Sequence, residues 1–236
     1  MTFYDEMRAY VLRHRAINNS YLDHFQTGAL TNEAFQAFAA EFYNFARFFP
    51  KILVAQLVNT EDEAVADELT AVLYSELGDG RTKNRHELLY RDFLRSARID
   101  IHEAISRPML PSTRAYIEGM EQLYSSGNHA MALGASFGLE NMAITMWDQL
   151  IPGLTSLQRN RYPNLDLTYF TFHRALESRH EEAMEKAVAA VDGGGTHSGK
   201  MTSEEREDFR RGVMAVLDYL EGFWMGLERT RSTQAA

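Results

Sequence analysis

The sequence contains no cysteine, and only five of its 236 residues are proline. Without cysteine the protein cannot form disulfides, bind iron–sulfur clusters, hold a metal through thiolates or use a cysteine nucleophile. No apolar run approaches the roughly 18 residues that a membrane span needs, so we expect no membrane segment. Residues 1–6 lack the basic segment and the apolar core of a secretion signal, so we expect a cytoplasmic protein.

Strong positive charge is also missing, because the formal net charge is -9 at pH 7. Nucleic-acid binders usually present a basic surface, so we expect no nucleic-acid partner. Apolar residues make up 45% of the chain, which is enough for a sizeable core. The acidic balance indicates little more, because many soluble enzymes are mildly acidic. A homodimer is a reasonable expectation for the assembly.

Helical periodicity dominates the chain, and no alternating pattern of a β-strand interrupts it. We therefore predict an all-α fold with a bundle of about seven to eight helices. Pro50 should kink or break the second helix near its end. The predicted helices cover residues 3–25, 31–50, 63–77, 84–98, 112–126, 128–150, 167–191 and 202–229.

Glycine and proline mark the predicted interruptions. Pro152 and Gly153 should end the helix before them and leave residues 154–166 irregular. The glycine-rich segment 192–202 predicts a flexible loop before the last helix. That helix has an apolar face that needs a partner, so residues 1–236 should form a single helical domain.

A cluster of ionisable residues lies in the helix predicted at 167–191. His173, Glu177 and His180 stand at positions i, i+4 and i+7, which project from one face of a helix. Two imidazoles and one carboxylate are suitable ligands for iron, manganese or zinc. Taken alone, the pattern also fits a polar helix face with incidental histidines.

Three further residues favour the metal interpretation. Glu76 ends one predicted helix and His86 opens the next, with glycines between them that allow the chain to turn. Glu140 stands in an almost wholly apolar stretch, where a buried carboxylate is costly unless a cation or a proton neutralises it. Its alternative position is a helix boundary that faces solvent. Helical bundles build di-iron sites from carboxylates and histidines on facing helices in this way.

In order and type, these six residues resemble the pattern of the haem-oxygenase-like di-iron oxidases and oxygenases, which share their fold with haem oxygenase and thiaminase-II-like proteins. The pattern is a helix-terminal glutamate, a histidine shortly after it, a mid-chain glutamate and a late His-x-x-x-(Asp or Glu)-x-x-His. The Glu-Leu-Gly-Asp-Gly segment at residues 76–80 is also similar to the family's, and the resemblance spans residues 38–182.

The resemblance implies a haem-oxygenase-like bundle that holds two iron ions without haem and uses dioxygen as co-substrate. Members desaturate, cleave or oxygenate small molecules, often amino acids or amino-acid-derived metabolites in biosynthetic pathways. N-oxygenating members add a carboxylate from an earlier helix; residues 42–53 hold no acid, and Glu41 lies just before them, which argues against N-oxygenation. The implied metal and catalytic residues are Glu76, His86, Glu140, His173, Glu177 and His180.

Within this hypothesis we assign Glu76, His86 and Glu177 to one iron and the other three ligands to the second. Arg47 could pair with a substrate carboxylate, and Phe38 belongs to an aromatic stripe that also fits core packing. The residues expected to orient the ligands are Tyr43, Asn44, Tyr169 and Asp148. The residues expected to bind substrate are Phe38, Tyr43, Arg47 and Arg174, with Lys51 as a further cation.

Two other functions remain open at this point. A haem-binding oxygenase would use His14 or His24 as its proximal ligand and the segment Gly134-x-x-x-Gly138 in its distal helix. That function leaves the late histidine–carboxylate set unexplained, and we expect Gly134 and Gly138 instead to allow close helix packing or the approach of the backbone to a substrate. A non-catalytic iron-binding or interaction protein of the same fold would bind iron but consume no oxygen.

Overall fold

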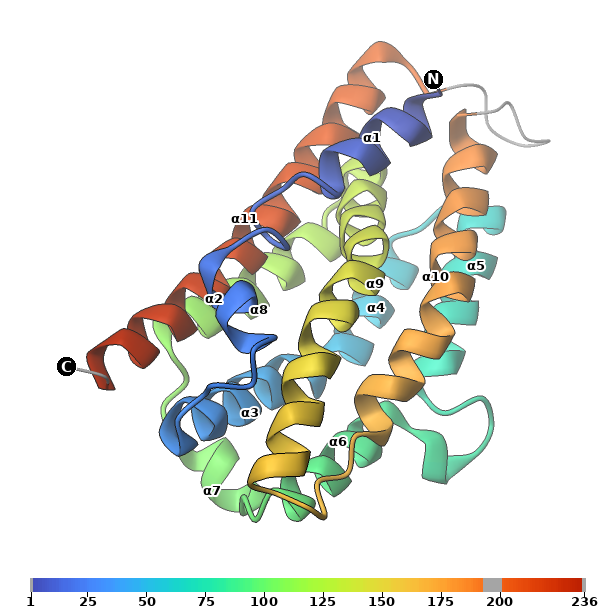
Figure 1. Ribbon diagram of the computed structural model, residues 1–236. Coiled ribbons are helices and arrows are strands. Elements are labelled where there is room, and N and C mark those ends of the chain that lie inside the picture. The colour runs from blue at the N-terminus through green and yellow to red at the C-terminus, as the bar shows by residue number, and fades with distance from the viewer. Residues whose placement is uncertain (1, 193–200, 235–236) are drawn as a thin grey trace.

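The computed structural model describes residues 2–192 and 201–234, which form helices joined by loops and contain no strand (Figure 1). The prediction of an all-α fold is therefore confirmed. In chain order the helices are α1 (Phe3–Val11), α2 (Ser20–Phe25), α3 (Asn32–Ala46), α4 (Phe49–Val58), α5 (Glu63–Glu76), the 3-10 helix η1 (Thr82–Asn84), α6 (His86–Ser96), α7 (Ile101–Ser106), α8 (Pro111–Tyr124), α9 (His129–Asn160), α10 (Thr168–Asp192) and α11 (Ser203–Gln234).

Polar residues ahead of the helices bind their first free backbone N–H groups. The side chain of Thr31 accepts a hydrogen bond from a backbone N–H in the first turn of α3. The side chains of Asp62 and Asn128 accept equivalent hydrogen bonds at the start of α5 and α9. These short-range contacts can be read from the sequence, since each cap stands directly before an apolar periodic segment. They fix where three of the helices around the candidate site begin.

The longest helices set the frame of the bundle. α9 packs against both α11 and α10, and α10 also lies beside α5 (Figure 1). The backbones of α9 and α11 touch, because a Cβ on Gly134 would lie 2.1 Å from the Phe209 carbonyl oxygen, and one on Gly212 would lie 2.0 Å from that of Met131. Gly138 likewise faces α11. The glycines at 134 and 138 thus serve helix packing.

One apolar core runs through the bundle, and helices near both ends of the chain contribute to it. The rings of Phe3 in α1 and Phe209 in α11 meet edge to face, with centroids 5.3 Å apart. Phe38 of the aromatic stripe is fully buried against Phe25, with ring centroids 4.6 Å apart. Trp224 of α11 is also fully buried, so the last helix shares this core.

The chain forms more helices than predicted, because the first expected helix is divided and two helices, α4 and α7, lie mostly or wholly where no helix was expected. The division separates α1 from α2, where the side chains of Asn18 and Asn19 bond to backbone carbonyls of residues 12–16. Pro50 breaks the second predicted helix, as expected. It lies in the first turn of a new helix, α4, where proline is tolerated.

α9 continues through Pro152 and Gly153 to Asn160, so the prediction of an irregular segment at 154–166 is wrong over most of its length. Gly153 allows α9 to pack against the end of α2, since a Cβ there would lie 2.1 Å from the Phe25 carbonyl oxygen. The glycine therefore serves a tertiary contact and does not end the helix.

Residues 193–200 of the loop predicted at 192–202 lie outside the described residues. Its two ends are ordered: Asp192 is the last residue of α10, and the buried Met201 donates its N–H to the Val191 carbonyl. Over residues 2–192 and 201–234, no helix has both the length and the apolar character that crossing a membrane requires.

Candidate metal centre

Glu76 and His86 lie at the two ends of one short loop. Glu76 is the last residue of α5, and His86 is the first residue of α6. Between them Gly78, Asp79 and Gly80 adopt positive φ angles of 96°, 51° and 75°, in the region that favours glycine. This turn brings His86 Nδ1 to 2.8 Å from a Glu76 carboxylate oxygen, with both side chains buried.

The other expected ligands come from α9 and α10. His173, Glu177 and His180 project from one face of α10, and Glu140 faces them from α9. His173 Nε2 lies 3.8 Å from a Glu76 oxygen, and His180 Nδ1 lies 3.3 Å from a Glu140 oxygen. Each of the six side chains belongs to a residue that is at most 6% exposed, so the structure brings all of them together in the interior.

Their donor atoms form two buried groups, and the atoms of each group lie within 4.8 Å of one another. The groups are Glu76, His86 and His173, and Glu140, Glu177 and His180. The partition assigned from the sequence differs, because it exchanged His173 and Glu177. A third group of this kind in the described residues is partly exposed, and Arg15 already pairs with one of its carboxylates.

Burial sets the charge of the metal-free site on α10. Burial, together with the neighbouring His86 ring, lowers the pKa of His173 to about 3, so this imidazole is neutral near pH 7. Burial and the facing Glu140 carboxylate raise the pKa of Glu177 to about 8. The Glu177 carboxyl therefore holds a proton near neutral pH when no cation is bound.

His180 and Glu76 are shifted against the effect of burial by their partners. Burial alone would lower the pKa of His180, but contact with Glu140 and the surrounding carboxylates raise it to about 9. Burial would raise the pKa of Glu76, but the neighbouring histidines hold it below its usual value. Protons thus balance the carboxylates, and a bound cation would take over that role.

Two neighbouring groups hold donor side chains in position. The Tyr169 backbone carbonyl accepts from His173 Nδ1 at 2.8 Å, which leaves Nε2 facing the site. The Trp147 indole N–H donates to a Glu177 oxygen at 2.7 Å. Contacts of this kind orient metal ligands and fix the tautomer of a histidine.

Several polar atoms of the site are buried without a hydrogen-bond partner among the described residues. They include His86 Nε2, His180 Nε2 and the second carboxylate oxygen of Glu177. Unpaired buried polar atoms are costly, so their convergence indicates a ligand. Imidazole and carboxylate donors without thiolate suit iron or manganese. The residues present therefore fit metal ions at this position.

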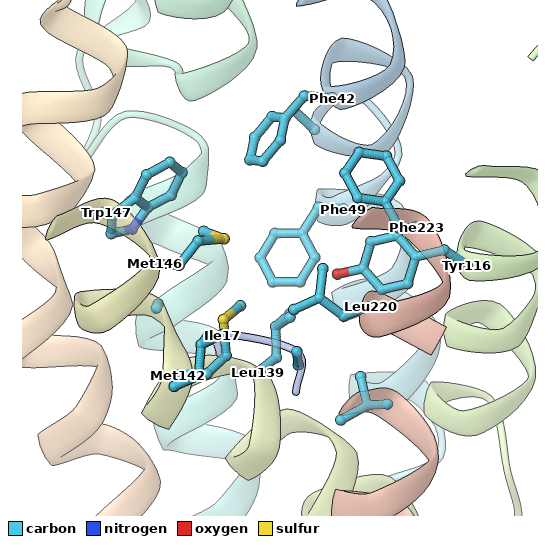
Figure 2. Close-up of a cluster of buried hydrophobic side chains, with 14 of the residues drawn as sticks. Ile17, Phe42, Phe49, Tyr116, Leu139, Met142, Met146, Trp147, Leu220 and Phe223 are labelled. Carbon is cyan, nitrogen blue, oxygen red and sulfur yellow. The ribbon is translucent and has the colours of Figure 1, made fainter. Parts of the chain in front are cut away.

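A cavity of about 50 Å³, here called the inner cavity, adjoins the donor atoms. Its other wall is apolar and comes from α3, α4 and α9, and Figure 2 shows several of these side chains around it. The residues of this wall are Phe42, Phe45, Phe49, Leu139, Met142 and Met146. An apolar wall beside polar donors is typical of a small-molecule site.

A larger space of about 680 Å³, here called the outer cleft, is lined by residues of α3 to α7. Glu76 lines both the outer cleft and the inner cavity. The cleft also carries the basic side chains of Arg47, Lys51 and Arg85 among apolar neighbours, whereas Arg91 is paired with a glutamate. The two spaces thus differ in charge, because the inner cavity has no arginine or lysine in its lining.

The expected substrate-binding residues fall into two sets. Tyr43 and Arg47 line the outer cleft. Phe38 is packed in the core, and Arg174 binds the Asp148 carboxylate at 2.6 and 3.1 Å, so neither lines the inner cavity or the outer cleft. Their positions do not support the role expected from the sequence, and Asp148 is paired away from the ligands.

The other residues that the sequence singled out differ in what they contact. Tyr169 contacts a candidate ligand through its backbone, whereas the Tyr43 hydroxyl donates to Glu87 at 2.6 Å. The Glu41 carboxylate accepts from the Leu110 N–H at 3.2 Å, ahead of α8, and belongs to neither buried donor group. It therefore binds the backbone directly ahead of α8.

Sequence reasoning missed Trp147. Its position carries a signal nonetheless, because it follows Glu140 by seven residues and so lies on the same face of α9. Met142 and Met146 of the inner cavity also lie on α9, within two turns of Glu140. A periodicity argument centred on Glu140 would have found Trp147, whereas Met142 and Met146, two and six residues after Glu140, do not share its face.

Comparison with known proteins gives three results. A family model described as iron-containing redox enzyme matches residues 36–221. The chain is 28% identical over 226 residues to 4-chloro-allylglycine synthase of Streptantibioticus cattleyicolor, which covers 95% of this chain and 82% of that protein. Several solved structures have a similar fold.

A CADD-like protein of unknown function from Nostoc punctiforme matches with a TM-score of 0.79 at 16% identity, over 97% of this chain and 96% of that one. A TenA homologue from Pseudomonas syringae matches with 0.75 at 14% identity, over 96% and 90%. A domain with a haem oxygenase-like fold from Shewanella denitrificans matches with 0.72 at 17% identity, over 99% and 92%. The expected haem-oxygenase-like fold is therefore confirmed.

Proposed function

Because the chain belongs to the family of iron-containing redox enzymes, we propose that it is a non-haem di-iron oxidase that uses dioxygen to oxidise a small molecule derived from an amino acid. The observation that carries this proposal is the pair of adjoining buried groups, with three histidines and three carboxylates between them. The name of the Streptantibioticus relative supports the substrate class, since allylglycine is an amino acid.

When bound, the two iron ions would supply the reduction of dioxygen and the removal of electrons from the substrate. The chain's own residues do the positioning. The Tyr169 carbonyl holds the His173 ring so that Nε2 faces the first group, and the Trp147 N–H fixes the Glu177 carboxylate in the second. The apolar wall of the inner cavity excludes water and holds the uncharged part of the substrate.

The outer cleft would recognise the acidic end of the substrate. Arg47 and Lys51 line it without a carboxylate partner among the described residues, so their charges are free to bind an anion. The reaction we propose is desaturation or carbon–carbon cleavage. We favour these over N-oxygenation because Glu41, the nearest extra carboxylate on α3, binds the Leu110 N–H ahead of α8 and lies outside both donor groups.

A haem-binding function finds no support in these contacts. Gly134 and Gly138 face α11, and neither His14 nor His24 lines the inner cavity or the outer cleft. The alternative is a non-catalytic iron-binding protein, and experiment must distinguish it from the proposed oxidase.

Anaerobic loading with ferrous iron, followed by exposure to oxygen, tests the proposal. We expect two iron ions per chain and oxygen uptake that an amino-acid-derived substrate accelerates. His173→Ala should lower the iron content and abolish oxygen uptake, whereas His129→Ala, at an exposed position on α9, should change neither. Iron binding without oxygen uptake would indicate a binding protein, and full activity in His173→Ala would contradict the assignment.

A further inference from the structure

Three tyrosines connect the candidate metal centre with the outer cleft. The ring centroid of Tyr169 lies 4.2 Å from that of His173, and the Tyr90 centroid lies 4.7 Å from that of Tyr169. Tyr43 continues the series, with its centroid 5.5 Å from that of Tyr90. The three rings come from α10, α6 and α3, so helices far apart in the sequence build one contiguous line of phenols.

The two ends of the line differ in their surroundings. Tyr169 lines the inner cavity beside the candidate ligands. Tyr43 lines the outer cleft, where its hydroxyl donates to a Glu87 oxygen at 2.6 Å and accepts from Arg91 Nε at 3.2 Å. Tyr90, between them, is fully buried, and its hydroxyl donates to the Ala39 carbonyl at 3.0 Å.

The partner of each hydroxyl decides which phenol can stay oxidised. A tyrosine that loses an electron becomes strongly acidic and is stabilised only if its phenolic proton can leave. A backbone carbonyl, which is the partner of Tyr90, is too weak a base to accept that proton. The Glu87 carboxylate at the Tyr43 hydroxyl can accept it, and Arg91 forms an ion pair with the same carboxylate. An oxidised state passed along the line should therefore come to rest on Tyr43.

We propose that Tyr169, Tyr90 and Tyr43 conduct electrons from the outer cleft to the metal centre. The proposal rests on the proposed function, because its oxidant is iron that dioxygen has oxidised. In each event the Tyr43 phenol loses one electron, which passes through Tyr90 and Tyr169 and reduces the iron centre by one electron. The phenolic proton passes to Glu87, which leaves a neutral tyrosyl radical at the cleft.

The position of Tyr43 indicates that the electron path protects the ligands of the metal centre. When no substrate occupies the inner cavity, an oxidised centre would otherwise attack its own ligands. Tyr43 is itself buried, at 2% exposed, but its hydroxyl bonds to Glu87 in the wall of the cleft. Transfer of the oxidation to Tyr43 therefore moves it next to the cleft, where a reductant bound in the cleft can return the electron over a short distance. The basic side chains of Arg47, Lys51 and Arg85 line the same cleft, so an anionic reductant such as ascorbate should be attracted to it.

Core packing alone would produce the same ring contacts, and tyrosine-to-phenylalanine substitutions separate the two roles. Phenylalanine keeps the ring and its packing but cannot form a phenoxyl radical. Tyr124 supplies the matched control, because it is fully buried and makes no ring contact in the part of the chain that the structure describes. The full-length protein is loaded anaerobically with ferrous iron and exposed to oxygen without substrate.

Iron content, oxygen uptake and the electron paramagnetic resonance spectrum are measured on each sample, and oxidised peptides are mapped by mass spectrometry. The wild-type protein should give a tyrosyl signal that narrows with ring-deuterated tyrosine, and its oxidised peptide should contain Tyr43. Per bound iron, Tyr43→Phe and Tyr90→Phe should each lose this signal, and Tyr124→Phe should keep it. Ascorbate should remove the signal from the wild-type protein.

An undiminished signal in Tyr43→Phe, or equal loss in Tyr124→Phe, would overturn the electron path. So would the absence of any tyrosyl signal in wild-type protein that binds iron and consumes oxygen normally. Those results leave the proposed oxidase function intact. Failure to bind iron or to consume oxygen would instead overturn the proposed function and the electron path with it.

Discussion

The indole of Trp147 holds the Glu177 carboxylate by a single N–H donor, and the second oxygen of that carboxylate accepts no hydrogen bond among the described residues and lies 3.8 Å from His180 Nδ1. One oxygen is thus fixed while the other is left for a cation. Hydrogen bonds of this kind typically change metal affinity when they are removed, because the ligand loses its preferred orientation. The effect of Trp147 on the site can therefore be measured through metal binding alone.

Trp147→Phe keeps an aromatic ring but removes the donor to Glu177. We expect the affinity for Mn²⁺ to fall by about 10- to 100-fold, the range typical of such contacts. Trp224→Phe is the matched control, because Trp224 is also fully buried and its indole N–H has no partner in the described residues. Anaerobic titration calorimetry measures both variants, and equal losses of affinity would contradict the role of the Trp147 donor.

The protons of Glu177 and His180 make metal binding depend on pH. Both groups have pKa values raised in the metal-free protein, to about 8 and about 9, so near pH 6 both carry protons that a cation must displace. Affinity for Mn²⁺ should therefore rise as the pH increases from 6 toward 9, and binding should release protons. Calorimetry in buffers of different ionisation enthalpy counts the protons. Proton uptake, or an affinity independent of pH, would contradict this assignment.

At the residue scale, the sequence identified which side chains meet but not how they pair. The sequence predicts the grouping of His173, Glu177 and His180, because helical spacing puts the three residues on one face. Their division between two groups depends on how α10 is rotated against α5 and α9, which tertiary packing decides. For that reason His173 joins Glu76, and Glu177 joins Glu140, against the predicted partition.

The loop between α5 and α6 depends on backbone conformations that few residues adopt. Gly78 has a φ of 96°, and a Cβ there would lie 2.5 Å from the Arg81 carbonyl oxygen. This loop sets the distance between Glu76 and His86, so strain in it should be felt directly at the candidate metal centre. In this loop the geometry of the site depends most directly on which residue occupies a position.

Gly78→Ala should destabilise the protein by about 1–3 kcal/mol, the usual cost of a side chain in such a conformation, and should lower the metal affinity. Gly127→Ala is the control, because nothing lies within 4 Å of its added Cβ. Thermal unfolding and Mn²⁺ titration test both variants. If Gly78→Ala matched the wild-type protein in both measurements, the loop would not be the constraint described here.

Element boundaries were predictable where the signal is local and failed where it is tertiary. Thr31, Asp62 and Asn128 cap their helices through contacts within one turn. Gly153 was misread as a helix end, because its purpose is a contact with Phe25 on another helix. The break between α1 and α2 was predictable in part, because asparagines such as Asn18 and Asn19 disfavour the interior of a helix. The helical periodicity around them nevertheless led to the prediction of one continuous helix.

At the scale of the whole molecule, the contact between α9 and α11 joins the two longest helices. Gly134 and Gly212 allow their backbones to touch, and α9 in turn carries Glu140. A side chain at this contact would push α11 away from α9 and loosen the bundle that surrounds the site. The all-α class followed from periodicity, and close helix packing at Gly134 and Gly138 was expected. Which helix lies against them was not, because glycines in a helix carry no information about the partner.

Gly212→Ala should lower the free energy of unfolding by about 1–3 kcal/mol, because its Cβ would meet the Met131 carbonyl oxygen at 2.0 Å. Gly222→Ala lies on the same helix with nothing within 4 Å of its Cβ. It should instead stabilise the protein by about 0.5–1 kcal/mol through helix propensity. Urea unfolding followed by circular dichroism measures both, and similar effects in the two variants would contradict the close packing.

The placement of Glu76 and His86 at opposite ends of one loop has a consequence for cleavage of the chain. A cation bound to both side chains would cross-link the two ends of the loop at residues 76–86. Lys83 is exposed in that stretch, where trypsin could cut after it. The metal would still join α5 to α6 after such a cut, and a chelator would remove this cross-link.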